Sequence, residues 1–344
     1  MIAPAVTMLA AAFAGGLVLA LVLTPLGIRV AWAVGYLDHP EARKLHTSAT
    51  ALLGGAVVFL AGLAAWTAVA IVLHRPAHSG GVFLFAGALV ALLVGLWDDR
   101  FGMRPWVKLL GQAAAGGALL ASGRIPDVGL PVAFEVVLAL LAIIALMNAV
   151  NFLDNMNGMV GGLTALTLAA FAWTSATRGA VGLASAQLAL AGACAGFLPY
   201  NFPRARIFLG DAGSLFLGYS LGASAVLAFT ASPRGWRRVG PLLMLAYPAF
   251  DIVFVVFTRL REGRKIYMGG KDHTNHRLAS VLRCPKTTVL LTWLNGAALC
   301  ASGLAVLKLN QPLPTLLLSG LWTIFLIWVG VRLASIPPPR NGPA

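Results

Sequence analysis

The acidic residues of this chain are few, and most lie in short polar segments between long apolar runs. Only 11 of the 344 residues are Asp or Glu. Two of them form the adjacent pair Asp98 and Asp99, and Lys108 follows on what we expect to be the next helix. Neighbouring carboxylates repel, so such a pair indicates a cation, a strong basic partner or one raised pKa suited to proton transfer. A purely structural pair, salt-bridged to Arg100 and Lys108, is the alternative.

A second polar segment, residues 148–158, combines four amides with one carboxylate. If a helix continues through it, Asn148, Asn151 and Asn155 share one face with Asp154, because residues three or four apart are neighbours on a helix. Oxygen ligands of this kind suit Mg²⁺, and amides also suit ribose or a base edge. Helix capping by asparagine is the structural alternative, but a cap requires one such residue and not four.

A third segment, residues 200–214, places Asp211 among small residues just before a long apolar helix. There Asp211 could cap the helix and still offer a free oxygen to a metal ion. The free amides at the start of the same helix favour a pyrophosphate. Asn201, at the beginning of the segment, is a candidate substrate ligand.

Two further segments hold candidate anion-binding residues. The first contains Arg43, Lys44 and His46, which could hold phosphate oxygens; the alternative is a juxtamembrane basic segment that meets anionic lipid headgroups. The second contains His273 and His276. These could form half a zinc site, but no cysteine or third histidine lies near, so we interpret them, with the neighbouring lysine and arginine, as anion-binding groups.

Long apolar runs must position these segments. The chain is 59% hydrophobic and only 10% charged, unlike any ordinary soluble domain. A span needs roughly 20 apolar residues. We therefore predict an all-α integral membrane protein, a single polytopic domain of residues 1–344 with about eleven transmembrane helices. The runs lie near 5–34, 53–73, 80–97, 106–122, 131–150, 159–176, 180–199, 214–231, 238–257, 287–307 and 312–334, and the catalytic loops near 36–52, 98–106, 151–158, 200–213 and 258–286.

The basic residues indicate which side of the membrane each loop faces. Consecutive loops alternate between the two sides of the membrane, so they form two sets. Most of the 25 Lys and Arg fall in one set, and we take that set as cytoplasmic. The N-terminus is then outside, the C-terminus is inside, and the five polar segments face the cytoplasm. Arg234, Arg237 and Arg238 run against this rule. The net charge of +14 is scattered between apolar runs and not clustered on one module, which argues against nucleic acid as a partner.

In this order, the five segments resemble those of the polyprenyl-phosphate N-acetylhexosamine-1-phosphate transferase family, of the glycosyltransferase family 4 type. The similarity spans about residues 37–278 and rests on the combination of DDRFG, NAVNFLDN, FLPYNFP and FLGDAGSLFLG. The family includes enzymes that start enterobacterial common antigen and wall teichoic acid, and the phospho-MurNAc-pentapeptide translocase of peptidoglycan synthesis.

The resemblance implies roles for individual residues. Asp211 would bind the catalytic Mg²⁺, with Mn²⁺ as a substitute, and Asp154 would lie nearby as a further metal ligand or catalytic group. Asp98 and Asp99 would activate or position the prenyl phosphate. The residues that the resemblance implies to bind substrate are Lys108, Asn148, Asn151, His273, His276 and Arg277. Residue type and position add Arg43, Lys44, His46 and Asn201 as predicted substrate ligands.

The implied activity is Mg-dependent transfer of an N-acetylhexosamine-1-phosphate from a UDP-sugar to undecaprenyl phosphate, with release of UMP, at the bacterial inner membrane. This would be the first membrane step of a cell-envelope polysaccharide pathway. Asn157 stands where many relatives have a second aspartate, and Ala51 replaces a common proline. The last loop lacks the histidine run of the peptidoglycan translocase. Ala51 and this loop shift the expected donor from UDP-MurNAc-pentapeptide to UDP-GlcNAc.

Two alternatives remain at this point. One is a translocase of the phospho-MurNAc-pentapeptide type, and the other, from a different class, is a secondary transporter. Transporters hold substrate near the midplane, usually between repeated halves, whereas this sequence shows neither repeats nor midplane charge except Asp251. The sequence also leaves open a homodimer and a two-step route through an aspartyl-phosphate.

Overall fold

The computed structural model describes residues 2–39, 49–72, 79–265, 270 and 272–337. The predicted phosphate ligands Arg43, Lys44 and His46 lie outside the described residues.

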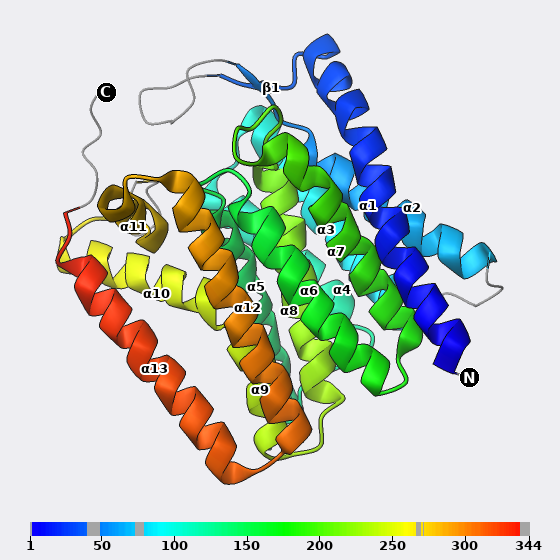
Figure 1. Ribbon diagram of the computed structural model, residues 1–344, viewed down its shortest axis with the longest axis vertical. Coiled ribbons are helices and arrows are strands. Elements are labelled where there is room, and N and C mark those ends of the chain that lie inside the picture. Colours follow the sequence, from blue (N-terminus) through cyan, green and yellow to red (C-terminus); the bar gives the residue numbers. More distant parts are fainter. Residues whose placement is uncertain (1, 40–48, 73–78, 266–269, 271, 338–344) are drawn as a thin grey trace.

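The described chain is almost entirely helical (Figure 1), because a backbone in hydrocarbon must satisfy its own hydrogen bonds. One two-residue antiparallel pair, β1 (Leu37–Asp38) with β2 (Thr50–Ala51), follows the first helix. The helices are α1 (Ile2–Ala33), α2 (Gly54–Val72), α3 (Ser79–Phe101), α4 (Pro105–Leu120), α5 (Val132–Leu153), α6 (Met159–Thr177), α7 (Val181–Asn201), α8 (Gly210–Thr230), η1 (Trp236–Arg238), α9 (Val239–Met244), α10 (Ala246–Arg261), α11 (Thr274–Leu282), α12 (Pro285–Leu309) and α13 (Pro312–Ala334).

The prediction of an all-α integral membrane protein is confirmed. Within the described residues, nine helices are long and apolar enough to cross a membrane, and η1–α9 with α10, bent by 65°, would form a tenth. Each of the eleven predicted runs contains a helix. However, α4 has only 16 residues, fewer than the roughly 20 that a straight span needs. The count of eleven and the orientation therefore stay predictions.

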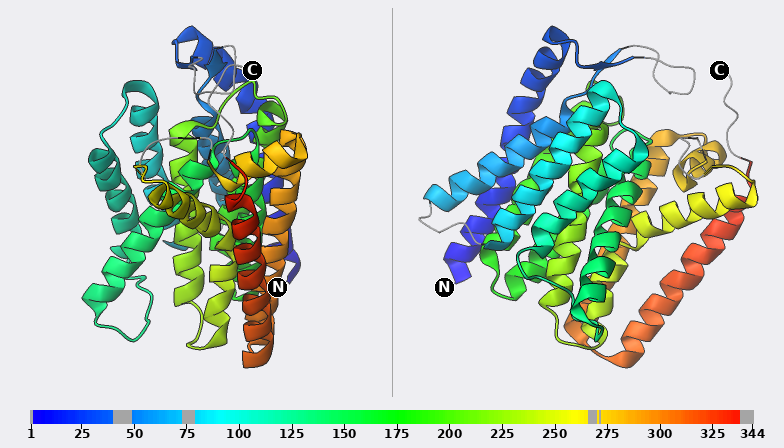
Figure 2. Two further views of the ribbon diagram at one scale, coloured as in Figure 1. Left: turned by 90° about the vertical axis from the view of Figure 1, so that its left-hand side faces the viewer. Right: turned by 180° about the vertical axis from the view of Figure 1, so that it is seen from behind.

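Helix α8 forms the centre of the bundle, with 89% of its most apolar window buried. It packs against α3 and α5, which are seen with α4 in cyan to green in the view from behind in Figure 2. Small residues allow the closest approaches: a Cβ at Gly95 of α3 would lie 2.3 Å from Ala212 Cα, and one at Gly55 of α2 would lie 2.3 Å from Gly213 N. These contacts fix the end of α3 against the start of α8.

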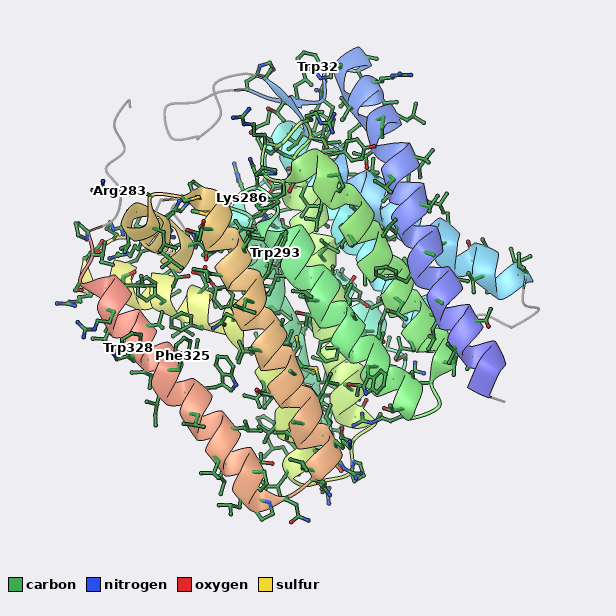
Figure 3. All side chains as sticks on the ribbon, viewed as in Figure 1. Trp32, Arg283, Lys286, Trp293, Phe325 and Trp328 are labelled. Carbon is green, nitrogen blue, oxygen red and sulfur yellow. The ribbon has the colours of Figure 1, made fainter. Side chains whose placement is uncertain are left out.

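Helix α13 differs from α8, because only 6% of its most apolar window is buried. Its apolar side chains include Phe325 and Trp328, which Figure 3 labels and which are 42% and 56% exposed. In a bilayer, such a helix face is covered by lipid tails. The polar loops lie elsewhere: β1 and α11 lie toward the top of Figure 1, whereas α9 and the N-terminus lie toward the bottom.

Two helix boundaries at the polar end differ from the prediction. α3 continues through Asp98 and Asp99 to Phe101, and α8 begins at Gly210 instead of near residue 214. The earlier start of α8 is possible because a carboxylate from α3 accepts the hydrogen bonds of its first amides.

Two further segments differ from the simplest interpretation of the sequence. α5 ends at Leu153, so Asn155 does not share a helix face with the other amides; its side chain donates to Phe152 O at 3.0 Å, a local bond that competes with the helix. The predicted loop from Thr258 to Lys286 contains the last turn of α10 and all of α11, since buried carboxylates and arginines satisfy polar groups there.

Candidate active site

Lys108 connects two carboxylates at the polar end of the bundle. Its Nζ lies 2.8 Å from Asp98 Oδ2 and 2.5 Å from Asp211 Oδ2. The three residues come from the first turn of α4, the last turn of α3 and the first turn of α8. The Lys108 and Asp98 side chains are only 16% and 12% exposed, whereas that of Asp211 is 35% exposed. One ammonium group faces two carboxylates, so the group is open to a further cation, and Asp211 is its most accessible member.

Amides from α5 hold Asp211 from the other side. Asn151 Nδ2 donates to Asp211 Oδ1 at 2.7 Å and to Ser214 Oγ at 2.8 Å. One turn earlier, Asn148 Nδ2 donates to Gln112 Oε1 at 2.7 Å. The structure thus brings the predicted Asn148 and Asn151 onto one face of α5, toward α4 and α8.

Asp99 acts on the backbone of α8. Its two oxygens accept hydrogen bonds from Asp211 N at 2.8 Å and Ala212 N at 3.0 Å. A Cβ at Gly210, where φ is +75°, would lie 2.6 Å from Asp99 Oδ2, so this position requires glycine. The expectation that free amides here bind a pyrophosphate is wrong for these two amides, because they already donate to Asp99. The Asp211 side chain is not the cap; Asp99 supplies it from another helix.

Asp154 follows the end of α5 and is partly buried. Burial, together with the nearby Asp211 carboxylate, raises the pKa of Asp154 to about 7. A carboxyl group with this pKa changes its protonation state near neutral pH, and binding a divalent cation would favour its ionised form.

Asn201 joins the two loops that lie beside Asp154 and Asp211. It is buried, its Oδ1 accepts from Gly158 N at 2.7 Å, and its Nδ2 donates to Ile207 O at 2.9 Å. Asn157, the departure from the family pattern that the sequence suggested, donates to Pro203 O at 3.2 Å. Both contacts hold loop backbone; substrate binding by Asn201 stays a prediction.

The histidine segment docks onto the end of α5. His273 lies with its ring edge-on to Phe152, at a centroid distance of 5.8 Å, and its Nδ1 is 2.9 Å from Asp251 Oδ2. His276 is buried in the first turn of α11. Arg277 donates to Leu333 O in the last turn of α13 at 3.3 Å and to Ile336 O, two residues beyond the helix, at 2.5 Å. Its described bonds therefore anchor α13, whereas its predicted contact with substrate stays a prediction.

Sequence reasoning gave no role to a buried ion pair beside this segment. Arg259 donates to both oxygens of Asp272, at 2.8 and 2.9 Å, and Arg264 donates to the same carboxylate at 2.7 Å. Burial would raise the pKa of Asp272, but the hydrogen bonds and charge of Arg259, with the charge of Arg264, hold it well below its usual range. The signal in the sequence was Arg259 at the end of an apolar run, where a charge needs a partner.

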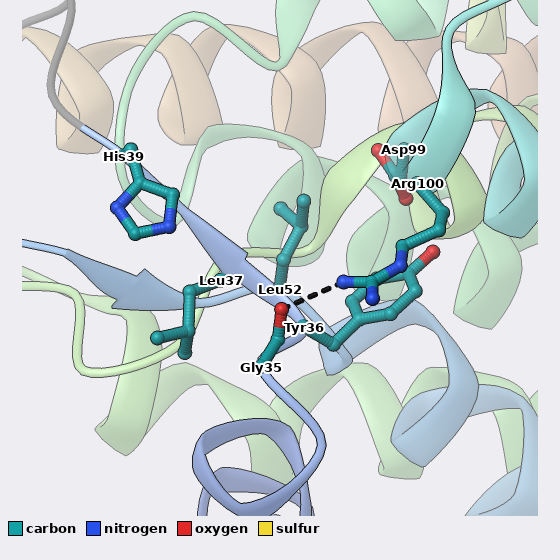
Figure 4. Close-up of a pocket in the computed structure, with 7 residues that line it drawn as sticks. All are labelled: Gly35, Tyr36, Leu37, His39, Leu52, Asp99 and Arg100. Atoms are coloured by element: carbon teal, nitrogen blue, oxygen red, sulfur yellow. Dashed lines mark hydrogen bonds between the residues drawn. The ribbon is translucent and has the colours of Figure 1, made fainter.

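A small pocket of about 220 Å³ lies on the side of Asp99 that faces β1. Figure 4 shows Tyr36, His39 and Arg100 in its lining. Arg100 Nη1 donates to Gly35 O at 2.7 Å, and its guanidinium lies 5.8 Å from the centre of the Tyr36 ring. The structural alternative for Asp98 and Asp99 was a pair of salt bridges to Arg100 and Lys108. The contacts of the described residues include the salt bridge to Lys108 but none to Arg100.

The donor atoms of the site suit Mg²⁺. The described residues include no group of three or more His, Cys, Asp or Glu placed to hold a metal. However, Mg²⁺ in enzymes is usually held by one or two carboxylates, and water and substrate phosphates complete its shell. The Asp98, Lys108 and Asp211 group carries two negative charges and one positive charge, and Asp211, 35% exposed, is the carboxylate that a metal ion could reach.

The fold and the site define a multi-pass membrane protein with a carboxylate, lysine and amide site at one end of its bundle. Residues 82–229 match the model of glycosyl transferase family 4. The chain is 31% identical over 352 residues to the decaprenyl-phosphate N-acetylglucosaminephosphotransferase of Mycolicibacterium smegmatis, covering 90% of this chain and 83% of that protein. This chain therefore belongs to glycosyl transferase family 4.

Two other relatives extend the comparison. The probable undecaprenyl-phosphate N-acetylglucosaminyl 1-phosphate transferase of Bacillus subtilis is 29% identical over 294 residues, with 83% of this chain and 81% of that protein covered. The phospho-N-acetylmuramoyl-pentapeptide-transferase of Desulforamulus reducens is 30% identical over 286 residues, with 76% and 84% covered.

Proposed function

We propose that this protein transfers N-acetylglucosamine-1-phosphate from UDP-GlcNAc to undecaprenyl phosphate and releases UMP, as the first membrane step of a cell-envelope polysaccharide pathway. The observation that carries the proposal is the group of Asp98, Lys108 and Asp211, held by Asn151, at the polar end of a membrane bundle. The names of the relatives support the same reaction.

The reaction joins two anions, so the site must neutralise charge. An oxygen of the lipid phosphate attacks the β-phosphorus of UDP-GlcNAc, the bond from that phosphorus to the bridging oxygen breaks, and UMP leaves with this oxygen. Lys108 places a fixed positive charge beside these phosphates. Asp211, with Asp154, would hold Mg²⁺, which supplies charge neutralisation at the pyrophosphate.

Asp98 is our candidate for orienting or deprotonating the lipid phosphate. It lies on the last turn of α3, beside two strongly exposed aromatic side chains, Trp97 (58%) and Phe101 (67%), and Trp106 (58%) begins the next helix. Aromatic side chains at this exposure are typical of the membrane–water interface. A phosphate on a prenyl chain would meet Asp98 at that level, from within the bilayer.

The polar end faces the cytoplasm of the bacterial plasma membrane in this proposal, with the N-terminus outside. The distribution of the 25 basic residues supports this orientation. Transport is a weaker candidate, because Asp251, the one charge that the sequence placed near the midplane, is paired within the protein with His273 and Thr274.

The test is product formation by the purified protein with undecaprenyl phosphate and Mg²⁺. With UDP-GlcNAc we expect UMP and a lipid whose mass has increased by GlcNAc-1-phosphate, and with UDP-MurNAc-pentapeptide no product. A product from UDP-MurNAc-pentapeptide alone would contradict the proposed donor. No product from any UDP-N-acetylhexosamine, with solute uptake by vesicles that contain the protein, would instead support a transporter.

A further inference from the structure

Asp251 is a carboxylate inside an apolar helix with both oxygens engaged. It lies in α10, is 0% exposed, and follows the 65° bend between α9 and α10. Its Oδ2 is 2.9 Å from His273 Nδ1, and its Oδ1 accepts from Thr274 N at 3.0 Å and from Thr274 Oγ1. Burying an unpaired carboxylate is costly, so these contacts explain how α10 tolerates the charge.

The same contacts set the start of α11. His273 is the residue before the helix, with extended backbone and no capping bond from its own side chain. Asp251 accepts the amide hydrogen of Thr274 instead, and so supplies the cap from α10. The position of His273 is therefore fixed by a residue 22 positions earlier in the chain.

The pairing also decides which ring nitrogen of His273 carries hydrogen. Nδ1 faces Asp251 Oδ2, so the tautomer with hydrogen on Nδ1 donates to this carboxyl group and leaves Nε2 for a second partner. The ring lies against Phe152, and the residue before Phe152 is Asn151, which holds Asp211. Asp251 thus holds the imidazole that packs against α5 one residue after Asn151.

We propose that Asp251 is a positioning residue for the transfer reaction: it holds His273 by Nδ1, so that Nε2 faces the phosphates of the sugar donor. The proposal rests on the proposed function, and nothing in the family match or in the names of the relatives assigns a role to this carboxylate. Asp251 itself does not touch substrate; it acts through His273.

A double-mutant cycle on kcat/KM for UDP-GlcNAc tests the coupling. Asp251→Asn places an amide NH₂ or a single acceptor oxygen at Nδ1, and we expect a loss of about tenfold to a hundredfold, as for other residues that orient a ligating histidine. His273→Ala should lose at least as much. The double variant should lose no more than His273→Ala alone, because Asp251 acts only through that ring. Thr258→Val, a buried threonine of the same helix, is the matched control and should keep the kcat/KM of the unmodified protein.

A second pair of variants keeps the test open if Asp251→Asn does not fold. In His273→Asn the amide nitrogen can replace Nδ1 and satisfy Asp251, whereas His273→Ala leaves that oxygen without its partner. Both should lose activity, but His273→Asn should unfold at a temperature closer to that of the unmodified protein.

Three results would overturn the inference: unchanged kcat/KM in Asp251→Asn, losses that multiply in the double variant, or equal unfolding temperatures for His273→Asn and His273→Ala. If the unmodified protein makes no product, the proposed function fails instead. In that case the unfolding temperatures of Asp251→Asn, His273→Ala and the double variant decide whether the two residues are coupled. If the decreases caused by the two single substitutions add in the double variant, the pairing is overturned.

Discussion

The two ends of helix α8 differ in how they use charged side chains. At its C-terminal end, Arg178 donates to Ala228 O at 2.7 Å and to Ser232 Oγ at 2.7 Å. At its N-terminal end, Asp99 accepts from the first amides, which complements the helix dipole in the same way. At the N-terminal end this cap is joined by two more carboxylates, Asp98 and Asp211, which share the one ammonium group of Lys108. Surplus negative charge, and not charge as such, marks the candidate site.

The same comparison accounts for two of the three arginines that run against the positive-inside rule, Arg234 and Arg238. Arg234 pairs with Asp127 Oδ1 at 2.7 Å, and Arg238 donates to Asp127 O and to Ser232 O. These side chains hold the loops after α4 and α8 together. These two arginines are bound by backbone carbonyls and one carboxylate, so we expect a structural role to place them here and not the preference of basic residues for cytoplasmic loops.

The largest effect should follow from removing the most accessible charge at the N-terminal end. Asp211→Asn removes a charged oxygen from the proposed metal site but keeps the shape of the side chain, so kcat should fall on the order of 10³-fold, as when other transition-state contacts are lost. UMP release measured at saturating UDP-GlcNAc checks this. Full activity would remove Asp211 from the site.

A smaller effect should separate capping from chemistry at Asp99. Asp99→Ala loses both acceptors for the amides of Asp211 and Ala212 and should lower kcat on the order of 10²-fold by displacing Asp211. Asp99→Asn keeps one acceptor, and asparagine is a good helix cap, so its loss should be less than tenfold. Equal losses in the two variants would instead mean that Asp99 transfers a proton. Comparison of kcat and of the unfolding temperature decides between these outcomes.

The pH dependence of stability should report Asp154. Its pKa is 3.8 when unperturbed and about 7 in the folded protein. Between these values the folded state holds a proton that the unfolded state has released, so the free energy of unfolding falls as the pH rises from about 4 to about 7. Unfolding temperatures measured without divalent cations should show this decline, and Asp154→Asn should flatten it. The same slope in the variant would assign the decline to another group.

The smallest effect on activity should come from the C-terminal end of α8. Arg178→Gln removes a structural anchor, so we expect the unfolding temperature to fall by roughly 2–4 °C, as for a loss of about 1 kcal/mol in a domain of moderate size. The kcat should stay within twofold of the unmodified value. A loss of activity as large as that of Asp211→Asn would abolish the distinction between the two ends.

Part of this arrangement could be predicted from the sequence. Asp98, Lys108 and Asp211 lie next to apolar runs. The alternation of consecutive loops between the two sides of the membrane places all three on the same side, and the structure brings them into contact. Asn148 and Asn151 lie one helical turn apart, so their shared face follows from helix geometry.

Other parts depend on contacts that no local pattern encodes. The backbone amides that Asp99 caps are 112 and 113 residues away in the sequence, so the capping role of Asp99 could not be predicted. From the sequence alone, the adjacent pair of Asp98 and Asp99 indicated a chemical role for both residues. Asp251 and His273 are 22 residues apart on helices whose angle depends on the bend after α9. A lone carboxylate in an apolar run predicts that a partner exists, but not which one.

Exchange of radiolabelled UMP into UDP-GlcNAc tests the central claim most directly. The claim is that the charges at the N-terminal end of α8 catalyse reversible sugar-phosphate transfer to a lipid phosphate. Purified protein with undecaprenyl phosphate, UDP-GlcNAc and Mg²⁺ should exchange the label, and exchange should stop when the lipid phosphate is omitted, when EDTA is added or when Asp211 is replaced by asparagine. Exchange that persists undiminished in Asp211→Asn, or no exchange by the unmodified protein, would contradict it.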